Sequence, residues 1–188
     1  MFLKESIDFY KKQFKKNNVS YDFFCFSNIA PDLKSHFDIG DFFIERHDYT
    51  AFDLFAKEIG YPLPNDICDY INAYWQPGVF GYYNTNECII LFPVVRYVND
   101  TLDSILLQKN GLINSAKQWK EVFGGDINKY LPIGYLGYSG INVLYEVSSG
   151  KIFLEDLNNE GVPEEKSISE SLRELIINLK IPDTKTKE

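Results

Sequence analysis

Residues 52–92 read FDLFAKEIGYPLPNDICDYINAYWQPGVFGYYNTNECIILF, and this stretch decides the fold. Phe52, Phe55 and Ile59 recur at three- and four-residue spacing, which predicts an amphipathic helix with one apolar side. Gly60 stands where a helix end favours a residue that can adopt positive φ. The two prolines that follow it prevent the helix from continuing, because proline lacks the backbone N–H and clashes with the preceding turn.

A second helix is expected from Asn65 onward, after the Leu-Pro turn. Its inner side is predicted to carry Ile67, Cys68, Ile71 and Tyr74. Beyond Gly78 the chain becomes apolar, aromatic and β-branched, a composition typical of strands. The sequence therefore predicts strands at Val79–Tyr83 and Cys88–Val95, joined by a polar turn at residues 84–86.

Outward from this stretch, helical and strand patterns are interleaved, which makes the chain an α+β protein. Helical spacing predicts helices over residues 4–17 and from Asn99 to Lys120, the second of them broken at Gly111. Residues 18–41 are expected to be irregular. The remaining predicted strands are Asp41–His47, Ile133–Tyr138, Asn142–Val147 and Lys151–Leu154.

The C-terminal helix has a distinct start signal. Ser167 followed three residues later by Glu170 predicts a capping box. The helix is expected to bury Ile168, Leu172, Leu175, Ile176 and Leu179, and to end before Pro182. No linker or repeat divides the chain, so residues 1–182 are predicted to form one domain and residues 183–188 a disordered tail.

The composition restricts the class of partner. The 188 residues include 19 basic and 27 acidic side chains, for a net charge of −8. This balance disfavours nucleic acid and suits a basic protein surface, although solubility alone could explain it. Three cysteines without a CxxC pair indicate neither a disulfide framework nor a zinc site. Neither a signal peptide nor a membrane span is evident, so a cytoplasmic location is expected.

The residues needed for catalysis are sparse. His36 and His47 are the only histidines, and both are expected to be exposed polar residues. Phosphate-binding, GxSxG and HExxH motifs are absent, and the glycines of Tyr135–Gly140 predict a bent strand or a close backbone approach. We therefore expect no catalytic residue, metal or other cofactor. An alternative is a small hydrolase using two carboxylates from Glu45, Asp48, Asp53, Glu58, Asp66, Asp69 and Glu87.

Acidic and aromatic residues alternate along the deciding stretch, which favours a protein-binding surface. Aromatic anchors flanked by acidic groups can bind a basic partner with an apolar tip. The predicted partner-binding residues are Asp66, Asp69, Trp75, Tyr82, Tyr83 and Glu87. The alternative is that Trp75 lies in the core together with one of the two tyrosines, since adjacent strand residues face opposite sides.

The segment EIGYPLPNDICDYINAYW, a strand pair and the closing ISESLRELIINLK helix resemble the SUKH superfamily. Its helix, Gly and Leu-Pro turn are matched by Glu58, Ile59, Gly60, Leu63 and Pro64. Within the superfamily the chain is most similar to the Syd family, whose founding member binds the SecY translocase. This likeness extends to Gln108–Lys120, Ser148–Asp156 and Leu179–Pro182.

The resemblance implies a mixed, mostly antiparallel sheet packed against helices, a binding role through an acidic concave face, and no enzymatic activity. Many members of the superfamily are immunity proteins that neutralise toxins of polymorphic toxin systems, and this is the expected function. The alternative that the Syd likeness implies is binding to SecY at the cytosolic face of the inner membrane, which would make the protein peripheral there.

Overall fold

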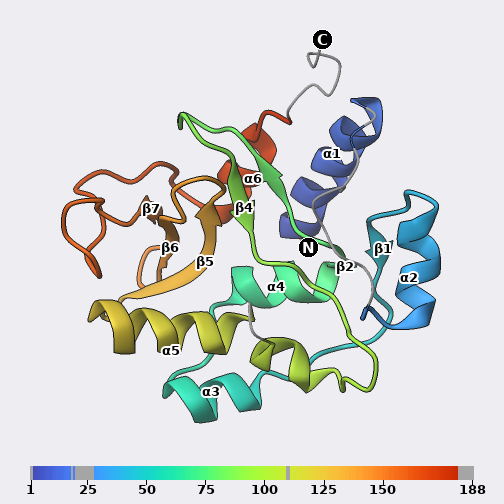
Figure 1. Ribbon diagram of the computed structural model, residues 1–188, viewed down its shortest axis with the longest axis horizontal. Helices are drawn as coiled ribbons and strands as arrows, with labels where there is room; N and C mark the ends of the chain where they lie inside the picture. The colour runs from blue at the N-terminus through green and yellow to red at the C-terminus, as the bar shows by residue number, and fades with distance from the viewer. Residues whose placement is uncertain (1, 18, 20–27, 109–110, 182–188) are drawn as a thin grey trace.

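The computed structural model describes residues 2–17, 19, 28–108 and 111–181 (Figure 1). These residues form α-helices, one 3-10 helix (η1) and β-strands. In chain order they are α1 (Phe2–Lys16), α2 (Pro31–Asp38), β1 (Ile44–Glu45), α3 (Asp53–Ile59), α4 (Asn65–Ala73), β2 (Tyr74–Trp75), β3 (Phe80–Gly81), β4 (Ile89–Leu91), η1 (Asp103–Leu107), α5 (Leu112–Phe123), β5 (Tyr130–Leu136), β6 (Asn142–Glu146), β7 (Ile152–Leu154) and α6 (Leu172–Asn178).

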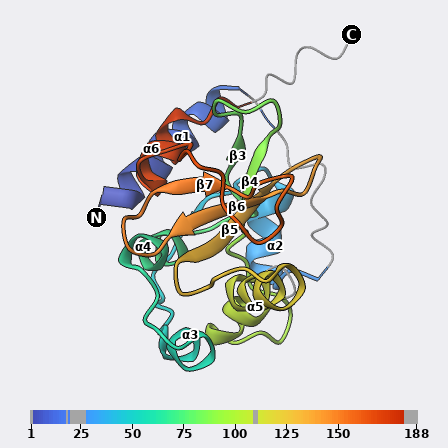
Figure 2. The same cartoon turned by 90° about the vertical axis from the view of Figure 1, so that its left-hand side faces the viewer.

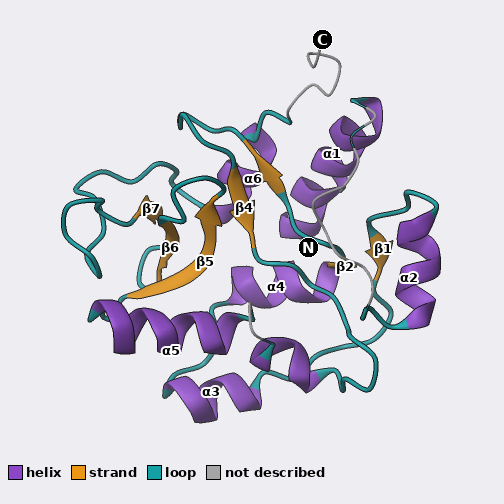
Figure 3. Cartoon of the chain, in the orientation of Figure 1, coloured by secondary structure: helices purple, strands orange, loops and turns teal. Residues whose placement is uncertain are grey.

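The strands form two sheets. The main sheet has five strands in the order β3-β4-β5-β6-β7, so neighbours in the chain are neighbours in the sheet, and β1 pairs with β2 in a small separate sheet. Every pairing between these strands is antiparallel. The α+β class predicted from the interleaved patterns is confirmed (Figure 3).

Helices cover the main sheet unequally. One face packs against α1, α6 and α4, which lie together on one side of the strands in Figure 2. On the other side α5 packs against β5 and covers only part of that face. Within the described residues, no helix covers the outer side of β4.

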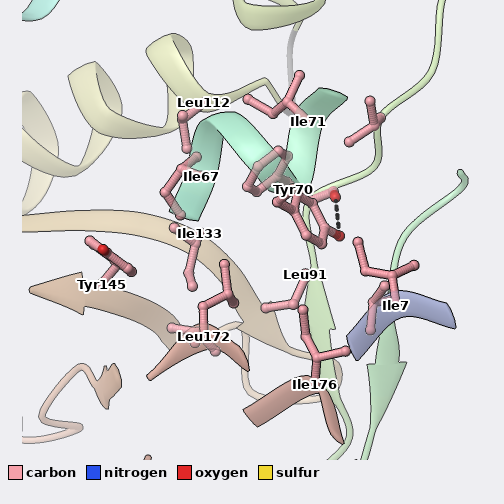
Figure 4. Packing of buried hydrophobic residues seen from close by; sticks show 14 of the residues in the cluster. Ile7, Ile67, Tyr70, Ile71, Leu91, Leu112, Ile133, Tyr145, Leu172 and Ile176 are labelled. Atoms are coloured by element: carbon pink, nitrogen blue, oxygen red, sulfur yellow. Dashed lines mark hydrogen bonds between the residues drawn. The ribbon is translucent and has the colours of Figure 1, made fainter. Parts of the chain in front are cut away.

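The core lies between the main sheet and the α1–α4–α6 layer (Figure 4). Ile67 and Ile71 of α4, together with Ile176 of α6, meet side chains that project inward from the sheet, including Leu91 and Ile133. All five are at most 1% exposed. Burial of an aliphatic side chain of this size contributes about 1.5–3 kcal/mol, so these few contacts are a major source of stability.

Glycine positions confirm three local predictions. Gly60 ends α3 with φ of +100°, the conformation expected at this C-cap. Gly111 separates η1 from α5, where a Cβ atom would lie 2.7 Å from the carbonyl oxygen of Ile105. At Gly134 a Cβ atom would lie only 2.3 Å from the carbonyl oxygen of Ile90, and the register of β5 shifts between Pro132 and Gly134. This strand is bent and closely approached, as its glycines predict.

Three boundaries differ from the prediction. Helix α2 lies within the range expected to be irregular, because Pro31 at its first turn starts a helix with only Leu33 and Phe37 buried. The strand expected at Asp41–His47 is reduced to Ile44–Glu45, which pairs with Trp75 and Tyr74 at the end of the helix stretch. The predicted tail at 183–188 lies outside the described residues.

The capping box predicted at Ser167 is wrong in position. The N–H of Ile168 donates to the carbonyl of Ile152 at 2.8 Å, and the N–H of Ile152 donates to the carbonyl of Ser169 at 2.9 Å. This backbone is therefore extended along the edge of β7 rather than helical. Helix α6 begins after Ser171, whose Oγ accepts the N–H of Glu174 at 3.1 Å, so the Ser-x-x-Glu start is one turn later.

Replacement of the two serines separates these possible caps. Ser171→Ala is expected to lower the free energy of unfolding by about 1 kcal/mol, since an orphan N–H of the first turn loses its acceptor. Ser167→Ala should change it by less than about 0.5 kcal/mol, as expected for a surface substitution. Urea unfolding of both variants measures the difference. A larger loss from Ser167→Ala would contradict the assignment of Ser171 as the N-cap.

Across the described residues, the helices fall short of the length and apolar character that a membrane-spanning segment requires.

Candidate functional site

The partly uncovered face of the main sheet carries a row of side chains across three strands. Ile90 of β4 lies opposite Tyr135 of β5, and Tyr135 lies opposite Asn142 of β6. Residues that are opposite each other in register share one face of a sheet. Their neighbours Ile89 and Leu91 are at most 1% exposed and face the core, whereas Tyr135 is 43% exposed. An apolar and aromatic strip therefore reaches solvent here.

Two hollows meet on this strip. The first, which we call the α5 pocket, has a volume of about 540 Å³ between α5 and strands β4 and β5. The second, the hairpin pocket, has a volume of about 610 Å³ and is lined by Phe80, Tyr82, Asn86, Glu87, Cys88, Ile90, Gly137 and Tyr138. Ile90 lines both, so the two hollows form one continuous depression, which we call the sheet groove.

The turn between β5 and β6 is held in place by a carboxylate. Glu87 Oε2 accepts the backbone N–H of Tyr138 at 3.0 Å and that of Ser139 at 2.7 Å. The N–H of Gly137 donates to the carbonyl of Cys88 at 2.8 Å. The hydrogen bond from the Ser139 backbone is the main cause that lowers the pKa of Glu87, so the carboxylate stays ionised at neutral pH. It therefore keeps both hydrogen bonds under physiological conditions.

Tyr138 at this turn is 95% exposed. Its backbone is fixed by Glu87, so binding a partner would cost less ordering entropy than for a tyrosine on a mobile loop. Tyrosine is enriched among residues that dominate binding energy. The groove thus has an aromatic side chain that is pre-positioned at its rim.

Of the predicted partner-binding residues, Tyr82 and Glu87 line the sheet groove. Tyr82 is 39% exposed. Tyr83 faces the opposite side, where its hydroxyl donates to Glu174 of α6 at 3.4 Å. The alternation of strand residues explains the difference.

Asp66 and Asp69 lie on α4, away from the groove. The hydroxyl of Tyr145 approaches Asp66 Oδ2 at 3.5 Å. Burial raises the pKa of Tyr145 to about 12, so its hydroxyl keeps the proton that it can donate. Because Tyr145 faces the covered side of the sheet, Asp66 lies on that side too, and the prediction of one surface that joins α4 to the hairpin is wrong.

Trp75 is 5% exposed, so the prediction that it is a surface anchor is also wrong. The Arg46 guanidinium lies 4.0 Å from the centre of its ring, and that of Arg96 lies 5.9 Å away. Arg46 in turn donates to Asp48 at 2.7 Å and to the carbonyl of Ile71 at 2.8 Å. The pairing of β2 with β1 draws Trp75 beneath these groups, where its ring provides cation–π contacts that stabilise the fold.

The residues missed from the sequence are Tyr135, Tyr138 and the lining of the α5 pocket. The segment YLGYSG carries a signal for them, because its tyrosines are interleaved with glycines that cannot cover them. The glycines by themselves indicate only a bent strand, and which of the neighbouring rings reach solvent depends on the helices that pack on the sheet.

The structure offers little for catalysis or metal binding among its described residues. His36 and His47 are exposed, as predicted, and line a third hollow of about 370 Å³ together with Asp32, Glu45 and Asp48. The described lining of this hollow contains no serine, threonine or cysteine. Burial raises the pKa of the Cys68 and Cys88 thiols to about 11, so both stay protonated at neutral pH. In the described ranges, no group of three or more His, Cys, Asp or Glu residues is arranged to hold a metal ion.

Comparison with known proteins adds no further identification. No protein-family model and no curated protein matches the sequence. The resemblance to the SUKH superfamily therefore stays a prediction from the residues that carry it.

Proposed function

We propose that this protein is a non-enzymatic binding protein that holds another protein in its sheet groove and blocks it, as an immunity protein does with a toxin domain. The observation that supports this most strongly is the 95% exposed Tyr138 on a turn fixed by the Glu87 carboxylate. A large exposed ring has no role in the core, and its rigid backbone suits recognition. The toxin class of partner comes from the resemblance to the SUKH superfamily.

A partner has to approach the face of the sheet rather than its edges. On β3, the N–H of Tyr82 donates to the carbonyl of Lys180 at 2.9 Å, and the N–H of Lys180 donates back at 2.8 Å. On β7, Ile152 is bridged to Ser169. Both edge strands thus already have partners within the chain, which disfavours addition of a strand from another protein.

The charge of the groove favours a basic partner. Glu87 is the one charged side chain among the described residues that line its two pockets, and the whole chain carries a net charge of −8. An acidic field attracts a cationic surface and speeds its association. The proposal places the protein in the cytoplasm, where it would meet the toxin domain.

Photo-crosslinking tests this function and identifies the partner in the same experiment. The photoreactive residue p-benzoyl-phenylalanine replaces Tyr138 in one variant and Tyr49 in a matched control. Tyr49 is also exposed, at 70%, but lines none of the three hollows described above. Cells that produce the protein naturally are irradiated, and the crosslinked species are identified by mass spectrometry.

The expected product is one protein with a basic surface, captured from position 138 and not from position 49, whose activity is inhibited by the purified wild-type protein. Capture of SecY would instead favour the Syd-like alternative over the toxin. Equal crosslinking from both positions, or none from position 138, would contradict binding in the sheet groove.

A further inference from the structure

We propose that the α5 pocket receives one arginine or lysine side chain that the partner projects into the sheet groove. This inference rests on the proposed function and specifies what the partner presents. The α5 pocket adjoins the groove through Ile90 and Tyr135, which belong to its wall. A side chain entering past Tyr135 would reach the space between α5 and the sheet.

The walls of the α5 pocket suit a long side chain with a charged end. Its described lining is mainly aromatic and proline, including Phe92, Tyr97, Trp119, Phe123 and Tyr135, and contains no lysine or arginine. Aromatic rings attract the cations of lysine and arginine through their negative faces. The aliphatic stems of these residues also pack well against apolar walls.

A buried carboxylate lies directly behind this wall. Glu155 is 7% exposed, and its Oε1 accepts the indole N–H of Trp119 at 2.9 Å and the backbone N–H of Gly161 at 2.7 Å. Its Oε2 accepts the side-chain amide of Asn142 at 2.6 Å. All three donors are N–H groups, so the carboxyl group acts only as an acceptor, as the ionised form does.

The charge on Glu155 has no cation to balance it among the described residues. The ion pairs of the described chain involve other acids, and Glu155 has only the three neutral donors. Two of these donors, Trp119 and Asn142, also line the α5 pocket. The pocket therefore lies one residue away from an uncompensated buried negative charge, whose field is weakly screened by the surrounding protein.

A guest cation in the pocket would compensate this charge. The hydrogen bond from Trp119 to a carboxylate adds electron density to the indole, which favours a cation near the ring. A neutral guest of the same shape would gain the apolar contacts but not this electrostatic attraction. The pocket should therefore discriminate by charge rather than by size.

The test uses two small probes that differ in charge and share a shape. N-acetyl-arginine methylamide and N-acetyl-citrulline methylamide are titrated into the whole protein, and ¹H–¹⁵N NMR follows the indole N–H of Trp119. The arginine probe should shift this resonance with an affinity at least about fivefold higher than the citrulline probe. In the Glu155→Gln variant, which retains an acceptor for Trp119, the two probes should bind alike.

Equal affinities of both probes for the wild-type protein would overturn the inference, and so would an unmoved Trp119 resonance with both probes. The indole N–H resonance of Trp75 is the internal control, since Trp75 lies outside the α5 pocket. Failure here is distinguishable from failure of the proposed function. Crosslinking through position 138 can succeed while the pocket shows no charge preference, and the reverse can also occur.

Discussion

Trp119→Ala is expected to lower the free energy of unfolding by about 3–5 kcal/mol, the usual loss when a buried tryptophan is truncated. The side chain is 1% exposed. A Cβ atom at Gly125 would lie 2.3 Å from a ring atom of Trp119, so backbone packs directly on the indole and cannot easily fill the space it leaves. The substitution also removes one of the three donors to the buried Glu155 carboxylate.

Chemical and thermal unfolding measure this effect. A loss of this size corresponds to a fall in melting temperature of roughly 6–20 °C for a domain of this length. Trp119→Phe is the matched control, since it retains an aromatic ring but lacks the N–H. It should lose less, about 1.5–3 kcal/mol for the hydrogen bond to a charged group. Equal stability of Trp119→Ala and the wild-type protein would show that α5 is not packed on the sheet as described.

Patterns confined to neighbouring residues could be predicted. The three- and four-residue spacing from Phe52 to Ile59 located α3. Gly60, Gly111 and Gly134 marked a cap, a break and a close approach, because each needs a conformation or a space that other residues do not tolerate. The alternation at Tyr82 and Tyr83 correctly indicated that one faces away from the other.

Features that depend on distant segments could not be predicted in this way. Ser167 and Glu170 have the spacing of a capping box, but residues 168–169 pair with Ile152, which is far away in the chain. The hydrogen bonds of that pairing hold the backbone extended until Ser171. Local sequence offered two Ser-x-x-Glu starts, and a tertiary contact selected the second.

The candidate site shows the same limit. Asp66 and Trp75 are close to Tyr82 in the sequence, but α4 and β2 carry them to the covered side of the sheet and into the core. Glu87 and Tyr138 are 51 residues apart and meet through hydrogen bonds. Half of the groove comes from residues after 111, whose relation to the β3–β4 hairpin depends on the register of β4 with β5. No spacing rule reports that register.

Tyr138→Ala should weaken binding of the crosslinked partner by about 30-fold or more, the loss expected when a central aromatic anchor is truncated. The fixed turn positions this ring before binding, so the loss should appear mainly as faster dissociation. The fold should be unaffected, because the side chain is 95% exposed and supports nothing in the core. Circular dichroism and melting temperature serve as checks.

The account is tested most directly by the dissociation constants of wild type, Tyr138→Ala, Tyr49→Ala and the double variant Asp66→Asn/Asp69→Asn with that partner, measured at one ionic strength. If the sheet groove is the binding site, Tyr138→Ala loses about 30-fold or more, while Tyr49→Ala and the α4 double variant stay within about twofold of wild type. A Tyr138→Ala protein that binds as wild type does, beside an α4 double variant that binds poorly, would contradict the account and place the site on α4.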